Sequence, residues 1–173
     1  MKTLIVIAAL LGVFLAPSLG NDNINIVNQD NIGGDDHQTV NIDNHDNIAN
    51  INNYNGWNSW DSICDYSRGS FAARFFDKKI CVVGKINKAS FPSLAQLSEV
   101  ARDKTRSRAP TPMSYSVSPN KVTDVGQFGK HIQALCKDIP TYTSQEAKDG
   151  QFSGFALCKS SSIITILGIS FCF

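Results

Sequence analysis

The chain has 173 residues, of which 42% are hydrophobic and 18% charged, with a formal net charge of +1. This composition can fill a hydrophobic core, which argues against a fully disordered chain, and the near-neutral charge argues against a strongly basic nucleic-acid-binding protein. The charges are unevenly placed, since residues 21–67 carry eight acidic side chains and no Lys or Arg, whereas residues 68–173 carry 15 basic and seven acidic ones.

Residues 1–20 have the pattern of a secretory signal peptide. Lys2 supplies a positive start, Leu4 to Leu15 is apolar, and Ser18 and Gly20 are small residues at the −3 and −1 positions of a cut after Gly20. The alternative is a membrane anchor, but this apolar run is shorter than the roughly 20 residues that a spanning helix needs. The apolar stretch at 163–173 is also too short. We expect a secreted protein without a membrane span.

Secretion changes how the five cysteines are interpreted. In an oxidising compartment they are candidates for disulfide bonds before they are candidates for metal ligands. No Cys-x-x-Cys pair is present, and His37, His45 and His131 are far from the cysteines in sequence. The sequence therefore predicts no metal site and no cofactor. The cysteines are Cys64, Cys81, Cys136, Cys158 and Cys172.

The region that follows the signal peptide is rich in asparagine, with 13 Asn among residues 21–58. Three short runs, at 24–27, 39–42 and 48–51, alternate apolar with polar residues, and Asn, Asp and Gly separate them. Such alternation is typical of short strands joined by tight turns. A disordered polar tract is the alternative. We expect strands that pair with the sheet formed by the residues after them.

The central part of the chain predicts a hairpin and two helices. Residues 71–76 and 80–83 are strand-like, with a turn at 77–79 between them. A first helix is predicted to begin at 90–93, and a second to run from about Asp124 to the residues before Pro140. Residues 152–158 and 163–173 are again strand-like. This order predicts an α+β fold with helices packed on an antiparallel sheet.

Between the two helices, residues 105–118 predict an extended, basic, exposed linker. The basic side chains of this part of the chain could bind anionic mucin glycans, and the alternative is an ordinary solvated loop. They are Arg102, Lys104, Arg106 and Arg108.

Several motifs in this order carry a family resemblance. Asp65 precedes two strands, Cys81 follows it by 16 residues, and Cys136 ends the second helix ahead of the Ile-Pro-Thr-Tyr run at 139–142. With the Phe-Pro-Ser-Leu run at 91–94 and the Trp-containing run at 55–60, this arrangement resembles the BRICHOS domain family, and within it the secreted gastric branch, the gastrokines. The resemblance implies a BRICHOS domain at 55–144, with an antiparallel sheet flanked by two α-helices. A strand-bearing region at 21–54 precedes it, and a β-prone region at 145–173 follows it.

The resemblance also implies roles for the cysteines. Cys81 and Cys136 should form the disulfide bond of the domain, and Cys158 with Cys172 is the other natural pair. Cys64 then remains. It is either a buried free thiol or the site of an intermolecular disulfide, which would give a homodimer or a covalent complex with a partner such as a trefoil-type peptide.

Asp65 corresponds to the characteristic acid of the family. Because its neighbours are apolar, we expect it to be at least partly buried. Protonation of a buried carboxylate as the pH falls is a candidate conformational trigger, and the alternative is an ordinary capping or turn aspartate.

No enzymatic function is predicted, because no nucleophile-elbow, phosphate-loop or metalloprotease motif is present. One hypothesis is a mucosal protein that maintains and protects the gastric epithelium, restrains proliferation, supports repair, and binds β-prone client polypeptides to slow amyloid formation. The alternative is an extracellular signalling ligand that acts through an epithelial receptor, a mucin or a disulfide-linked partner without chaperone activity. Nucleic acid is not an expected partner.

Overall fold

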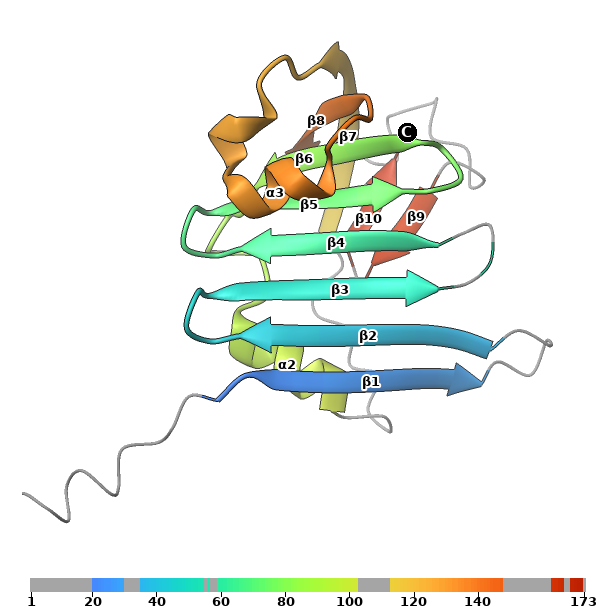
Figure 1. Ribbon diagram of the computed structural model, residues 1–173, viewed down its shortest axis with the longest axis vertical. Coiled ribbons are helices and arrows are strands. Elements are labelled where there is room, and N and C mark those ends of the chain that lie inside the picture. The colour runs from blue at the N-terminus through green and yellow to red at the C-terminus, as the bar shows by residue number, and fades with distance from the viewer. Residues whose placement is uncertain are drawn as a thin grey trace, which may run out of the picture.

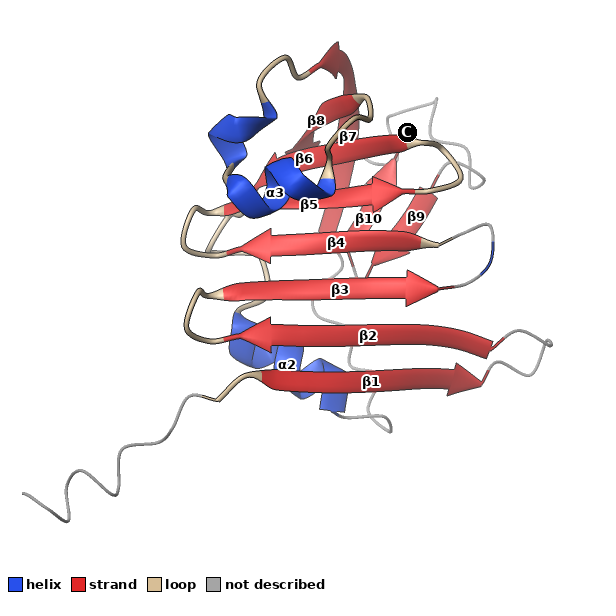
Figure 2. Ribbon diagram, viewed as in Figure 1, coloured by secondary structure: helices blue, strands red, loops and turns tan. Residues whose placement is uncertain are grey.

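The computed structural model describes residues 20–29, 35–54, 56, 59–102, 113–147, 163–166 and 169–172. These residues form an α+β structure built on one mostly antiparallel sheet, with short helices on its faces (Figures 1 and 2). The elements are β1 (Asp22–Gln29), β2 (Asp35–Asp43), β3 (Ile48–Tyr54), β4 (Trp60–Asp65), β5 (Ser70–Phe75), β6 (Ile80–Lys85), α2 (Leu94–Arg102), β7 (Met113–Lys121), the 3-10 helix η2 (Val125–Phe128), α3 (Lys130–Leu135), β8 (Thr141–Glu146), β9 (Ile163–Ile166) and β10 (Ile169–Cys172).

The described strands lie in the order β1-β2-β3-β4-β5-β6-β8-β7-β10-β9. The first six follow one another as an antiparallel meander, and the sequence predicts strands in all three Asn-rich runs that become β1, β2 and β3. The later strands depart from chain order, because β8 lies between β6 and β7 and pairs with β6 in parallel. The C-terminal strand β10 also pairs in parallel, with β7.

Three four-residue turns connect β2 to β3, β4 to β5 and β5 to β6. Each turn ends in a residue with left-handed φ: 55° at Asn47, 61° at Gly69 and 52° at Lys79. Such a residue closes a hairpin loop of this length, and Gly and Asn adopt this conformation at low cost. The turn residues therefore set the register of the meander.

Alternation along the strands divides the core into two layers. On β5, Phe71, Ala73 and Phe75 face one side of the sheet and join the larger cluster, which we call the α2-face core because Leu97 of α2 packs into it. Ala72 faces the other side and joins the α3-face core with Phe128 and Ile132. In Figure 1, α2 lies behind β1 and β2, and α3 lies in front of β5; α3 also contacts β4.

Strand β7 corrects one prediction from the sequence. Residues 113–118, assigned to an exposed linker, belong to this strand, and Met113 and Tyr115 are buried in the α2-face core. Residues 105–112 lie outside the described part of the chain. The signal was the alternation of Met113, Tyr115 and Val117 with serine, which the Arg- and Pro-rich stretch immediately before it obscured.

Both helices differ in detail from the prediction. Helix α2 begins at Leu94, after Ser93 and Gln96 form a reciprocal capping box in which Gln96 N donates to Ser93 Oγ (3.3 Å) and Ser93 N donates to Gln96 Oε1 (2.8 Å). The second predicted helix is divided in two. Asp124 caps the start of η2, and Gly129, with φ of 109°, interrupts the helical conformation between η2 and α3.

Candidate functional site

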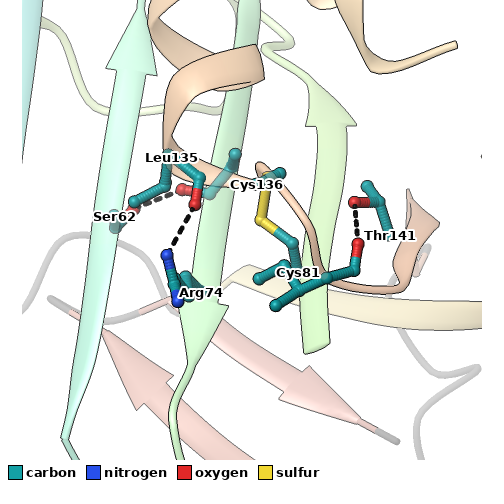
Figure 3. The surroundings of a disulfide bond; sticks show 8 residues. Ser62, Arg74, Cys81, Leu135, Cys136 and Thr141 are labelled. Carbon is teal, nitrogen blue, oxygen red and sulfur yellow. Dashed lines mark hydrogen bonds between the residues drawn. A yellow bond between two sulfur atoms is a disulfide. The ribbon is translucent and has the colours of Figure 1, made fainter. Parts of the chain in front are cut away.

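One disulfide bond joins Cys81, in the middle of the sheet, to Cys136, directly after α3 (Figure 3). The two Cα atoms are 5.5 Å apart, and both residues are buried in the α3-face core. Cys81 N also donates to Pro140 O (2.9 Å), so β6 holds both ends of the short segment that leads from α3 into β8. This is the bond that the family resemblance implied.

Arg74 supports the same helix from the neighbouring strand. Its guanidinium Nη1 donates to the carbonyl oxygen of Leu135 (3.2 Å), one of the carbonyls at the end of α3 that have no partner within the helix (Figure 3). The guanidinium also lies over the ring of Phe76, 5.3 Å from its centroid. The helix is thus attached to the sheet by a covalent bond and by a charge-assisted hydrogen bond.

Asp65 lies at the end of β4, with 1% of its surface exposed. Its Oδ1 accepts from the backbone N of Arg68 (2.9 Å) and from the hydroxyl of Ser67 (2.6 Å), so the carboxylate caps the turn into β5. The Arg68 guanidinium Nε lies 4.0 Å from Oδ2. Asp65 is therefore buried, as expected, and it is also the capping residue of a turn, whereas its role as a pH-dependent trigger stays a prediction.

The loop between η2 and α3 covers this buried carboxylate. A Cβ placed on Gly129 would lie 2.5 Å from Arg68 Cδ and 3.5 Å from Asp65 Oδ2. Only glycine combines this close approach with the positive φ of 109°. On the same face, Lys85 donates to Ser70, the residue paired with Asp65 across the strands, and lies over the ring of Phe128.

Cys64 is adjacent to Asp65 in sequence but lies on the opposite face of the sheet. Its thiol is buried in the α2-face core and is free, and it pairs across the strands with Ala49 and Phe71. Burial raises the pKa of the Cys64 thiol to about 12, so the reactive thiolate is scarce near neutral pH. This placement disfavours disulfide formation between Cys64 and another molecule in the folded state.

An aromatic cluster surrounds this part of the α2-face core. Phe91 stacks on Phe71 with ring centroids 5.5 Å apart, and Tyr115 meets Phe71 edge to face at 4.9 Å. Tyr66 lies 6.2 Å from Phe91 and donates its hydroxyl to the carbonyl oxygen of Pro92. Burial raises the pKa of the Tyr66 phenol well above its usual range. These rings bring the loop before α2, the meander and β7 together.

The last strands of the described structure occupy the edge of β7. In the parallel pair, Ile169 lies opposite Met113, Phe171 opposite Tyr115 and Cys172 opposite Ser116, and β9 then pairs with β10 as a hairpin. The sequence predicts strands at 163–173 but gives no partner for them. The β-prone C-terminal segment is therefore an added pair of strands on the domain's own sheet.

Some residues singled out in the sequence lie beyond this description. Cys158 and the basic positions 104, 106 and 108 are outside the described residues, and for Cys172 and Arg102 only the backbone is described. His45 is exposed and hydrogen-bonds to Asp46, whereas His131 is half-buried on α3. No group of three potential metal ligands occurs among the described residues, and none of the helices described is long and apolar enough to cross a membrane.

Comparison with known proteins adds three kinds of finding. The model of the BRICHOS domain matches residues 56–143. Gastrokine-1 of Homo sapiens is 43% identical and gastrokine-1 of Sus scrofa 44% identical, each aligned over 99% of this chain and 97% of the relative. Gastrokine-3 of Homo sapiens is 31% identical over 97% of this chain and 95% of the relative. No solved structure matches.

Proposed function

Because this chain belongs to the BRICHOS family and is similar to gastrokines over nearly its full length, we propose that it is a secreted, non-enzymatic protein of the gastric mucosa. Its proposed role is to maintain and protect the gastric epithelium, by restraining proliferation and supporting repair. The similarity to gastrokine-1, at 43% and 44% identity, supports this part of the proposal. It is tested by adding the purified protein to gastric epithelial cells and measuring proliferation and wound closure against dose. A response equal to that of heat-unfolded protein would contradict it.

The second part of the proposal is chaperone-like binding of β-prone segments by strand addition. The observation that supports it is the parallel pairing of β10 with β7, which shows that the edge of β7 accepts an extended segment. Strand addition of this kind gets its affinity from backbone hydrogen bonds and therefore tolerates varied client sequences. A client would take the position that the chain's own C-terminal strand occupies here. Slowing of amyloid formation then follows from capping client strands before they stack.

Fibril formation by an amyloid-forming peptide, followed by thioflavin fluorescence, tests this mechanism. Ser170→Pro removes a backbone donor from β10, opposite Ser114 of β7, and weakens the docked strand. We expect this variant to prolong the lag phase more than the wild-type chain does, because the edge of β7 becomes available. Thr165→Pro lies in β9, which pairs with β10 and not with β7 in the described sheet, and it is the matched control. Equal lag times for Ser170→Pro and the wild type would remove β7 as the client site. A lag time that no form of the protein prolongs, the wild type included, would reject the chaperone activity.

Covalent partners remain a separate proposal that the position of Cys64 does not favour. A disulfide with a trefoil-type peptide or a second copy would require the buried thiol to become accessible. Non-reducing electrophoresis of the secreted protein distinguishes these cases. A purely monomeric band would reject covalent assembly, and a shifted band that disappears in Cys64→Ser would support it.

A further inference from the structure

Strand β1 forms one end of the sheet. Within the described structure it pairs with β2 alone, in an unbroken register from Asp22 opposite Ile42 to Gln29 opposite Asp35. In an antiparallel strand every second residue directs its N–H and C=O away from the neighbouring strand. The outer side of β1 is therefore a row of backbone donors and acceptors that a further strand can use.

The edge of β1 lacks the residue types that usually prevent an exposed edge strand from pairing with another chain. Natural edge strands carry lysine, proline or a bulge that prevents another strand from pairing. Residues 22–29 contain no Lys, Arg, Pro or Gly, and Asp22 is their single charged residue. One face of β1 is also packed against the rest of the domain, because α2 contacts the strand and Ile24 packs against the α2-face core. An edge that is already ordered loses little conformational entropy when it pairs.

We propose that β1 pairs with β1 of a second copy of this chain, antiparallel, about a two-fold axis at Asn25. Two-fold pairing places like positions at equal distances on either side of the axis. With the axis at Asn25, Ile24 lies opposite position 26 of the second copy, which is also isoleucine, and Asn23 lies opposite position 27. Residues an even number apart share a face of the strand, so the core-facing side of each sheet continues into that of the other.

Both the pairing of the isoleucines and the position of the Asp22 charge favour a two-fold axis at Asn25. An axis at position 26 would set position 26 opposite itself but Ile24 against an asparagine at position 28, so the seam would have one isoleucine pair in place of two. With the axis at Asn25, the two Asp22 residues lie at opposite ends of the seam, each opposite position 28, so the single charge of the strand meets no like charge. The assembled sheet runs without interruption through both copies. The proposal does not depend on client binding or on Cys64.

Sedimentation velocity of the full secreted chain over a wide range of concentration tests the proposal. In Asn25→Lys the two introduced ammonium groups lie opposite each other across the axis. We expect the dimer Kd to rise about tenfold or more, because like charges directly opposite in a sheet repel. Asn41→Lys is the matched control, because Asn41 is an exposed asparagine on the neighbouring strand β2, within the sheet. It should leave the Kd within about twofold of the wild type, as expected for a surface change outside the interface.

A charge-swap experiment tests the position of the axis. Asn25→Lys and Asn25→Asp should each be largely monomeric alone and should associate when mixed in equal amounts, since position 25 faces itself. Cys64→Ser should dimerise like the wild type. A wild-type chain that stays monomeric at all concentrations would overturn the proposal, as would equal dimerisation of Asn25→Lys and Asn41→Lys. Loss of fibril suppression in Asn25→Lys with a monomeric wild type would assign this edge to a client instead.

Discussion

Removal of the Cys81–Cys136 bond should cost the fold a large part of its stability. The bond closes a loop with a sequence separation of 55 residues. In the chain-entropy model, a loop of this length stabilises the folded state by about 4 kcal/mol, because the open unfolded chain gains the conformations that the bond had excluded. The whole domain is expected to have only about 5–15 kcal/mol of stability, so the double variant Cys81→Ala, Cys136→Ala should be marginally folded.

Urea unfolding followed by circular dichroism measures this effect. With an m value of about 2 kcal/mol/M, the midpoint should fall by roughly 2 M. Cys64→Ala is the control, since it removes a buried sulfur without opening a loop and should cost about 1 kcal/mol. Hydrogen exchange should localise the change to η2 and α3, which the bond ties to β6. A loss below about 1 kcal/mol in the double variant would refute the reasoning, because it would mean that other contacts already constrain this loop.

Three further predictions concern single sites. In the folded chain Cys64 should resist alkylation by iodoacetamide at neutral pH and should react once urea unfolds the domain, because burial raises its pKa to about 12; rapid native labelling would contradict this placement. Gly129→Ala should lower the free energy of chemical unfolding by about 2 kcal/mol or more, because the new Cβ would meet Arg68 at 2.5 Å at a position with left-handed φ. Gly69→Ala has open space around it and should lower the free energy by about 1 kcal/mol. Equal losses in the two variants would be inconsistent with the packing over Asp65. The hydrogen bond to Asp46 raises the pKa of His45. The pair should therefore stabilise the fold at pH values below the unfolded-state pKa of the imidazole, and this stabilisation should be lost as the pH rises through the folded-state pKa. An NMR titration in which Asp46→Asn leaves the titration midpoint of His45 unchanged would exclude this cause.

Local pattern was enough to predict the three strands of the Asn-rich region and the hairpin of β5 and β6, whereas β4 was not predicted as a strand. The Asn-rich runs alternate apolar and polar residues, and Val40 and Ile42 are buried while Asn41 between them is exposed, as alternation requires. The turn residues at the ends of β2, β4 and β5 are also local signals. The structure extends the three Asn-rich strands by a few residues, because pairing with a neighbour orders polar residues that have no strand preference of their own.

The remaining features depend on contacts between distant segments. No local signal places β8 between β6 and β7, or β10 in parallel beside β7, since both pairings join residues far apart in sequence. The break between η2 and α3 falls at Gly129, where φ is 109° and the backbone comes close to the Arg68 side chain, a contact that no local pattern predicts. Cys64 and Asp65 are adjacent in sequence, yet adjacent residues of a strand point to opposite faces, and the sheet separates their side chains.

The insertion of β8 between β6 and β7 has a consequence for the order of folding. Strands β1 to β6 form contacts between neighbours in sequence and can assemble as hairpins while the rest of the chain is still being synthesised. Strand β7 follows, but the position beside β6 belongs to β8, so β7 has no strand partner until residues 141–146 arrive. In that interval the apolar side of β7, with Met113 and Tyr115, lacks the pairing that holds it over the core. The late step is therefore the closure of β8, and the C-terminal hairpin can dock only afterwards.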